Sequence, residues 1–335
     1  MNKIKIGIVG YGNVGKGAHK AVLASDDMEA FGIFTRRDPK TLDIIDKKTP
    51  VFPLDSAEGL RDNIDVMILC GGSATDLPKQ GPMLAKNFNI VDSFDTHANI
   101  PEYLDQVNSV ATATTAIIST GWDPGLFSML RLLSEAVLPG GNCYTFWGKG
   151  VSQGHSDAIR RVDGVKNAVQ YTIPIDSALD AVRRGECPEF TTRQKHLRQC
   201  YVVAQAGADG AKKSQIEETI KKLPNYFDQY DTTVEFISEE ELKTNHSEMP
   251  HGGFVLHSGN TGGNADGSTG SNKQIIEYSL KLDSNPEFTG SVMAAYARAA
   301  YRLSREGQFG AKTVFDIPLT YISPKNRSEL IRRLL

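Results

Sequence analysis

The sequence predicts an α/β protein, in which a Rossmann-type, doubly wound parallel sheet is followed by a second domain of α+β type. Three observations predict this fold class. A strand-like run at residues 5–9 leads directly into the glycine-rich segment GYGNVG. Apolar runs then alternate with helical stretches over about 120 residues, which is typical of parallel sheets. After Gly121 the strand-like runs become longer and alternate between polar and apolar residues.

The first half of the chain contains short apolar runs typical of buried parallel strands. A helix is expected after Val14, where Ala18 and Val22 follow at helical spacing, and another is expected at residues 82–86. The expected strands lie at residues 5–9, 30–35, 65–70, 89–92 and 115–119. Crossover connections between such strands build a doubly wound sheet.

The second half predicts an antiparallel sheet that is covered on one face. Helices are expected at residues 176–184 and 214–223, and the Gly/Ser/Asn tract at 260–272 predicts a mobile hairpin tip on the surface. The expected strands lie at residues 144–147, 168–173, 199–205, 233–237, 253–257 and 274–282.

The length of 335 residues favours two domains. We expect the first domain at residues 1–122 and the second at 123–289. A long helix at 286–305 and a short final helix after Pro324 end the chain, and we expect residues 290–335 to pack back on the first domain.

Composition excludes several classes of protein. Lys and Arg number 37 against 40 Asp and Glu, and a net charge of −3 argues against a nucleic-acid-coating surface or a polybasic membrane anchor. The four cysteines are far apart without a CxxC pair, and the seven histidines show no metal-ligand spacing, so no metal is expected. No apolar run approaches the roughly 18 residues that span a bilayer, and we expect a cytoplasmic protein.

The segment Gly10-x-Gly12-x-x-Gly15 follows a strand and opens a helix, which is the context of a dinucleotide-binding turn. Gly10 permits the tight turn, Gly12 lets the backbone approach a pyrophosphate, and Gly15 lets helix and strand pack closely. The N–H groups at the start of the helix would bind the phosphates. A glycine-rich turn without a ligand is the alternative. The candidate residues of this turn are Gly10, Tyr11, Gly12, Asn13, Val14 and Gly15.

The end of the second expected strand predicts which dinucleotide binds. An acidic residue there would bind a ribose 2′-hydroxyl, but this chain has Thr35, Arg36 and Arg37. Two guanidinium groups and a hydroxyl suit a 2′-phosphate, so NADP is favoured over NAD. Solvated surface charges are the alternative.

A second small-residue loop follows the strand that ends at Cys70. The carboxyl ends of parallel strands meet the dinucleotide, and small side chains there would let the nicotinamide ribose approach the backbone. The candidate cofactor-binding residues of this loop are Cys70, Gly71, Gly72, Ser73, Thr75 and Asp76.

Two further strand ends carry acids, in VDSFDTH and STGWDPG. The acid of the first segment is Asp92 or Asp95, of which we favour Asp95, and the acid of the second is Asp123. Two such carboxylates could bind a substrate ammonium and accept its proton. A helix N-cap is the alternative, above all for Asp123, which precedes Pro124.

The polar run at residues 145–157 contains Trp147 and three glycines. It predicts a loop that closes over a site, with Trp147 excluding water from it. A tryptophan in the domain core is the alternative.

Together these stretches resemble the meso-diaminopimelate D-dehydrogenase family over nearly the whole chain. WGKGVSQGHSDA is the most specific stretch, because a general Rossmann enzyme has no reason to contain it. The matching segments, in order, are GIVGYGNVG, IFTRRDP, LCGGSATD, STGWDPG, TFWGKGVSQGHSDAIRRVDGV, VQYT, RQCYVV, MPHGG and LKLDSNPEF.

The resemblance implies an NADP-dependent amino acid dehydrogenase of the lysine and peptidoglycan precursor pathway. Such an enzyme reversibly deaminates the D-centre of meso-2,6-diaminopimelate and yields L-2-amino-6-oxoheptanedioate (tetrahydrodipicolinate), ammonia and NADPH. It also implies a homodimer in which a dinucleotide-binding domain is joined to a substrate-binding and dimerisation domain. We expect the substrate to enter a cleft between the domains, which then close.

The resemblance also implies residue roles. Asp95 and Asp123 would hold the D-centre amino group, and Trp147 would shield that centre. The expected substrate-binding residues are Gln153, Gly154 and Asp157 in the pocket, and Thr172, Arg198, His251 and Asn285 at the distal L-centre. Arg198 can bind a carboxylate through two parallel hydrogen bonds.

Two other function classes remain open at this point. One is a different NADP-linked oxidoreductase on a similar frame, such as a dihydrodipicolinate-reductase-like enzyme or a semialdehyde dehydrogenase. The latter would require a cysteine nucleophile beside a base, whereas Cys143 and Cys200 lie within expected strands. The other is a regulator that binds NADPH without catalysis.

Overall fold

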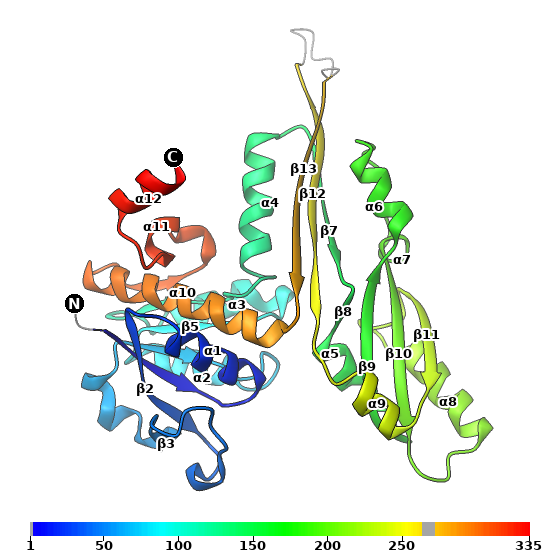
Figure 1. Cartoon of the computed structure of the whole chain (residues 1–335), viewed down its shortest axis with the longest axis horizontal. Coiled ribbons are helices and arrows are strands. Elements are labelled where there is room, and N and C mark those ends of the chain that lie inside the picture. The colour runs from blue at the N-terminus through cyan, green and yellow to red at the C-terminus, as the bar shows by residue number, and fades with distance from the viewer. Residues whose placement is uncertain (1–2, 263–271) are drawn as a thin grey trace. The chain divides into compact units, whose positions relative to one another are not determined.

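A computed structural model of the chain describes residues 3–262 and 272–335. The chain divides into two compact units (Figure 1). The first comprises Met1–Met129 and Pro286–Leu335, and the second comprises Leu130–Asn285. Within the described residues, no helix is both long and apolar enough to cross a membrane.

The first unit contains a seven-stranded sheet in the order β14-β6-β5-β4-β1-β2-β3. Every neighbouring pair of these strands is parallel, so the predicted doubly wound sheet is confirmed. The chain order reverses between β1 and β4, which is where such sheets bind ligands. The strands are β1 (Ile4–Val9), β2 (Met28–Thr35), β3 (Val51–Pro53), β4 (Val66–Leu69), β5 (Ile90–Asp92), β6 (Thr115–Ile117) and β14 (Gly310–Lys312).

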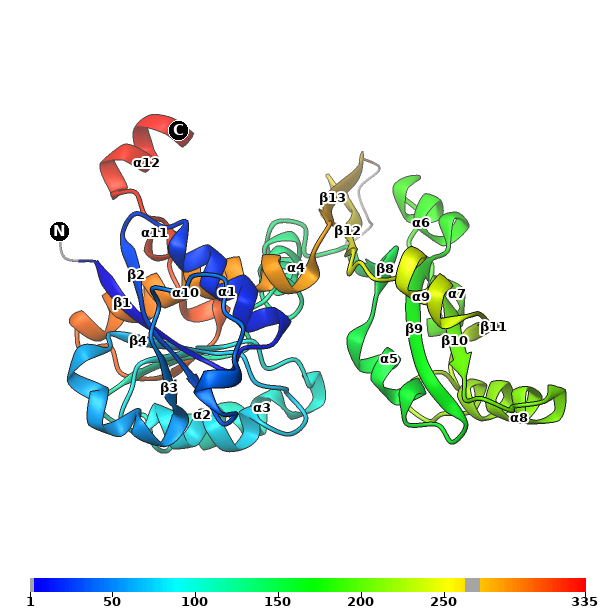
Figure 2. The ribbon, with the colours of Figure 1, turned by 60° about the horizontal axis from the view of Figure 1, so that its bottom comes forward.

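Helices cover both faces of this sheet, because successive residues of its strands point to opposite sides. Ile8 and Ile68 pack in a cluster with α1 and α10, whereas Val9 and Leu69 pack in a second cluster with α2 and α3. Figure 2 shows α1 and α10 on one side of the strands and α2 and α3 on the other. The helices are α1 (Asn13–Leu23), α2 (Leu77–Ala85), α3 (Ile100–Asn108) and α10 (Asn285–Arg305).

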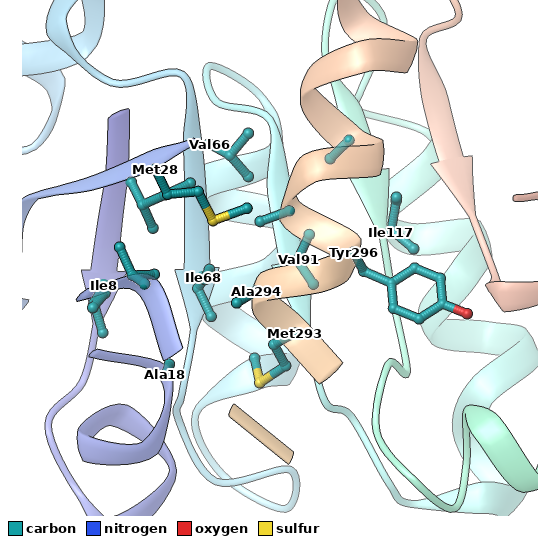
Figure 3. Packing of buried hydrophobic residues seen from close by; sticks show 14 of the residues in the cluster. Ile8, Ala18, Met28, Val66, Ile68, Val91, Ile117, Met293, Ala294 and Tyr296 are labelled. Atoms are coloured by element: carbon teal, nitrogen blue, oxygen red, sulfur yellow. The ribbon is translucent and has the colours of Figure 1, made fainter. Parts of the chain in front are cut away.

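The C-terminal segment completes the first unit. Figure 3 shows Met293 and Tyr296 of α10 beside Val91 and Ile117 of the sheet. Arg298 of α10 is buried and donates two hydrogen bonds, of 2.5 and 2.8 Å, to the carboxylate of Asp27 before β2. These bonds lower the pKa of Asp27. Asp27 itself is half-buried, and the pair ties the C-terminal segment to the sheet. The chain ends with α11 (Leu319–Ile322) and α12 (Arg327–Leu334).

The second unit contains two sheets, so the expected single antiparallel sheet is wrong. One sheet has the order β11-β10-β9-β8, in which β10 and β11 are parallel; the other has the antiparallel order β13-β12-β7. The parallel pair arises because α8 forms a crossover between β10 and β11. The strands are β7 (Asn142–Trp147), β8 (Gly150–Val151), β9 (Val165–Pro174), β10 (His196–Ala204), β11 (Asp231–Phe236), β12 (His251–Thr261) and β13 (Asn272–Leu282).

The helices of the second unit pack on these sheets. The cluster around Phe227 joins α5 and α8 to β9 and β10, and a separate cluster around Phe146 joins α6 to β7 and β12. The helices are α5 (Gln153–Arg160), α6 (Asp176–Arg183), α7 (Thr192–Lys195), α8 (Gly210–Lys221) and α9 (Glu239–Asn245), while α4 (Leu126–Val137) contains the boundary between the units.

One local prediction needs correction. The expected loop at residues 145–157 is instead the end of β7, the short strand β8 and the start of α5. The side chain of Ser152 caps α5 by accepting from the N–H of His155, which polar composition alone did not indicate. Most of the tract predicted as a hairpin tip, residues 260–272, lies outside the described residues; β12 and β13 on either side of it form an antiparallel pair up to Thr261 and Asn272.

Candidate active site

The glycine turn after β1 has the geometry of a phosphate-binding turn. Gly10 has a φ of +85°, and its N–H donates to the carbonyl of Phe34 at 2.8 Å. A Cβ atom on Gly15 would lie 2.2 Å from the carbonyl oxygen of Gly10, whereas one on Gly12 would meet no described atom within 4 Å. Gly15 therefore permits close packing, and Gly12 leaves open space beside the turn.

The first turn of α1 suits an anion. Among the described residues, no side chain caps this helix and no acidic residue lies in its first turn. The backbone N–H groups there need acceptors, and the helix dipole favours negative charge. This end of α1 therefore fits the pyrophosphate of a dinucleotide.

The two arginines after β2 lie beside this turn. The N–H of Arg37 donates to the hydroxyl of Thr35 at 3.0 Å, and its guanidinium donates to the carbonyl of Tyr11 at 2.8 Å. Arg36 forms an ion pair of 2.6 Å with Asp76, although its side chain is 65% exposed. Two guanidinium groups thus follow β2 beside the glycine turn, and this pair of charges would suit a 2′-phosphate.

Three candidate cofactor residues have side chains that are engaged within the protein. The Tyr11 side chain is buried and its hydroxyl bonds to Nδ1 of His19 at 2.9 Å, so only its backbone remains at the turn. Asp76 accepts from the N–H of Gly72 at 3.1 Å and pairs with Arg36, which holds the small-residue loop next to that arginine. Burial raises the pKa of Cys70 to about 12, so this thiol is a packing group.

Asp92 is a structural residue. It is fully buried, and its carboxylate accepts from the hydroxyl of Tyr103 at 2.7 Å and from the N–H groups of Phe94 and Ser119, both at 3.0 Å. Burial raises the pKa of Asp92, while the hydrogen bonds from Ser119, Phe94 and Tyr103 oppose that shift. Asp92 thereby ties together the segments that follow β5 and β6, which supports Asp95 as the acid available to a substrate.

Asp95 and Asp123 follow adjacent strands of the sheet, β5 and β6. The Asp95 side chain is exposed, and its N–H donates to the hydroxyl of Ser73, in the small-residue loop, at 3.1 Å. Asp123 is half-buried in the turn between β6 and α4, next to the buried Trp122. Both acids thus lie at the sheet edge where the carboxyl ends of the strands meet.

The second unit contains a buried cation. Arg198 is 5% exposed and lies opposite Thr172 in the β9–β10 ladder, where its Nη1 donates to the threonine hydroxyl. Its Nη2 donates to Nε2 of His155 at 3.2 Å, and the guanidinium carbon lies 3.9 Å from the ring centre of Tyr230. Nε has no hydrogen-bond partner among the described residues.

Arg198 lacks an anionic partner within the described part of the chain. Burial lowers the pKa of this guanidinium, and the groups that oppose the shift are Tyr230 and Cys200, with no carboxylate among them. A buried charge without a counter-ion is unfavourable unless a ligand supplies one. The geometry therefore fits the carboxylate of a bound molecule, which guanidinium groups bind with paired hydrogen bonds.

Trp147 is held by a histidine that the sequence analysis did not single out. Its backbone N–H donates to Nε2 of His196 at 2.8 Å, and the two rings stack with centres 5.3 Å apart. Burial lowers the pKa of His196 to about 3, so the imidazole is neutral and can accept this bond. Trp147 is only half-buried, so its ring is fixed in place without belonging to the core.

Of the other predicted substrate residues, Gln153, His251 and Asn285 lie around the start of β12. The amide of Gln153 donates to the sulfur of Met249 at 3.2 Å, and the N–H of Asn285 donates to the Met249 carbonyl at 3.0 Å. His251 packs against β8, where a Cβ atom on Gly150 would lie 2.5 Å from its ring. Gly154 and Asp157 lie exposed on α5, where Asp157 pairs with Arg160.

The parallel sheet with its glycine turn defines a dinucleotide-binding protein of Rossmann type with a second, separate α+β unit. A family model described as "Diaminopimelic acid dehydrogenase C-terminal domain" matches residues 121–284. The meso-diaminopimelate D-dehydrogenase of Ureibacillus thermosphaericus is 62% identical over 100% of both chains. The chain belongs to the meso-diaminopimelate D-dehydrogenase family, as the sequence motifs predicted.

Solved structures agree with this assignment. The DAP dehydrogenase of Corynebacterium glutamicum in complex with DAP is 45% identical over 100% of both chains, with a TM-score of 0.91. An engineered D-amino acid dehydrogenase bound to NADP⁺ is 43% identical over 100% of both chains, with a TM-score of 0.87.

Proposed function

We propose that the protein oxidises the D-centre of meso-2,6-diaminopimelate with NADP⁺. The products are L-2-amino-6-oxoheptanedioate, which cyclises to tetrahydrodipicolinate, together with ammonia and NADPH. The observation that carries this proposal is the buried Arg198, which has no carboxylate partner in the described residues and lies beside Thr172. A substrate with a second carboxylate supplies the missing counter-ion. The family membership favours this enzyme over another NADP-linked oxidoreductase or a regulator without catalysis.

The first unit is the proposed dinucleotide-binding domain. The glycine turn and the start of α1 bind the pyrophosphate, and Thr35, Arg36 and Arg37 bind the 2′-phosphate. The bound nicotinamide accepts a hydride from the substrate. The loop of Gly71, Gly72 and Ser73 leaves room for the nicotinamide ribose.

The chain's own residues bind the substrate and control its protons. Asp95 and Asp123 orient the D-centre ammonium and accept a proton from it, directly or through water, which leaves a neutral amine. The D-carbon then loses its hydride to become an imine, and water hydrolyses the imine to the ketone and ammonia. Trp147, fixed by His196, limits the access of water to the D-centre before that step.

Recognition of both ends of the substrate explains the stereochemical preference. Arg198, Thr172, His251 and Asn285 are the proposed partners of the distal L-centre, and Gln153, Gly154 and Asp157 line the rest of the pocket. A meso compound presents its D-carbon for oxidation only when the L-centre is held at the other end. Buried polar groups that lose their partners discriminate strongly against the wrong ligand.

The test of this function offers NADP⁺ with meso-, LL- and DD-diaminopimelate separately, at mildly alkaline pH, and follows NADPH absorbance. We expect reduction with the meso isomer and a rate at least about 100-fold lower with the others. Equal rates on all three isomers, or no reduction with the meso isomer, would contradict the proposal.

We also propose that the second unit forms a homodimer and that the protein is cytoplasmic. Exposed apolar side chains on α4 support the dimer, since Leu132 and Leu133 are each 50% exposed and Val137 is 60% exposed. A mass of one chain in light scattering at micromolar concentration would contradict the dimer.

A further inference from the structure

We propose that His155 is a positioning residue, which fixes the guanidinium of Arg198 in the orientation that receives the distal carboxylate of the substrate. This inference rests on the proposed function, because it assigns the carboxylate that Arg198 binds. Sequence motifs alone give His155 no role: it is a single histidine at the start of a helix and lies far from Arg198 along the chain.

The contacts of Arg198 leave it a single orientation. Its Nη1 donates to the Thr172 hydroxyl, its Nη2 donates to Nε2 of His155 at 3.2 Å, and Tyr230 covers one face at 3.9 Å. Thr172 restrains one nitrogen and Tyr230 restrains the plane. The bond to His155 restrains the remaining rotation within that plane, so its loss would free the guanidinium to turn.

The direction of the hydrogen bonds defines the state of His155. Arginine only donates hydrogen bonds, so Nε2 of His155 must accept and carry no proton. The proton of the neutral ring is therefore on Nδ1, which donates to the hydroxyl of Ser152 at 2.6 Å. Ser152 is the N-cap residue of α5, so the helix start, the imidazole and the guanidinium form one connected chain.

The ring of His155 is also restrained by packing. It makes edge-to-face contacts with Tyr226 and Phe227, at ring-centre distances of 5.4 and 5.7 Å. Desolvation by this packing and the charge of Arg198 lower its pKa to about 3, so the ring stays a neutral acceptor throughout the pH range of an assay. A rigid neutral acceptor orients the arginine without neutralising it, which leaves the positive charge available to a carboxylate.

The test compares wild-type enzyme with His155→Leu, which has no acceptor, and His155→Gln, whose amide oxygen lies near the position of Nε2. Loss of a hydrogen bond to a charged group weakens binding by a factor of about 10 or more. We expect His155→Leu to raise KM for meso-diaminopimelate by about ten-fold or more, with kcat within about three-fold. His155→Gln should have a KM for meso-diaminopimelate close to the wild-type value.

Two controls separate positioning from a general effect on folding. The melting temperature of His155→Leu checks its folding, and its KM for NADP⁺, which binds to the first unit, should equal the wild-type value. When His155→Leu is added to Arg198→Met, kcat/KM for meso-diaminopimelate should not fall further.

The outcomes are distinguishable. An unchanged KM for meso-diaminopimelate in His155→Leu overturns the positioning role. The role is also overturned if His155→Leu lowers kcat/KM by the same factor in the Arg198→Met background as it does in the wild-type enzyme. A wild-type enzyme that does not oxidise meso-diaminopimelate contradicts the proposed function instead.

Discussion

Replacing Arg198 with methionine should lower kcat/KM for meso-diaminopimelate by about 10³-fold, mostly through KM. The variant removes the buried cation and leaves the distal carboxylate of the substrate in an apolar position without a partner. Leaving one member of a buried charge pair unpaired costs about 2–5 kcal/mol, and the expected loss in kcat/KM lies within the fold-changes that correspond to this energy. Methionine fills a similar volume, so we expect the β9–β10 ladder to persist.

The control for this prediction is Arg193→Met. Arg193 pairs with Asp231 at 2.9 Å on the surface and is 53% exposed, so its loss should change kcat/KM by less than about two-fold. The melting temperatures of both variants check their folding. An Arg198→Met enzyme with the wild-type rate and KM on the meso substrate would show that the distal carboxylate binds elsewhere.

The double variant Arg36→Ala/Arg37→Ala should raise KM for NADP⁺ by about 100-fold or more. We propose that each guanidinium donates a charge-assisted hydrogen bond to the 2′-phosphate, and such bonds are worth about 1.5–3 kcal/mol each. KM for NAD⁺, which lacks this phosphate, should change much less, so the preference between the two cofactors should narrow. The measurement is steady-state kinetics with each dinucleotide at saturating meso-diaminopimelate.

A matched control for the arginine pair is Lys40→Ala, which removes a nearby exposed cation from the turn after β2. Its KM for NADP⁺ should stay within about two-fold of the wild-type value. If the arginine double variant keeps the wild-type preference for NADP⁺, another group binds the 2′-phosphate.

The first unit was predictable because its signals are local. Buried parallel strands appear as continuous apolar runs, and the glycine turn has a fixed spacing relative to β1 and α1. The two sheets of the second unit were not predictable in the same way. The parallel pairing of β10 with β11, and the separation of β7 and β12 from β9, depend on contacts between segments far apart in the sequence.

The site shows the same division. Arg198 and Thr172 were named from family motifs, and the structure brings them together because they are paired residues of adjacent strands. Neither His155 nor His196 has a local signature, since each acts on a residue from another element. The choice between Asp92 and Asp95 also needed the structure, because burial and three donors give Asp92 a structural role.

We propose that the protein recognises both ends of one meso substrate and therefore oxidises only its D-carbon. The most direct measurement uses meso-diaminopimelate carrying deuterium at either the D- or the L-α-carbon, followed by mass spectrometry of the reduced cofactor. We expect deuterium to appear in the cofactor from the D-labelled substrate alone, with a slower rate if hydride transfer limits turnover. Transfer of deuterium from the L-labelled substrate would contradict it.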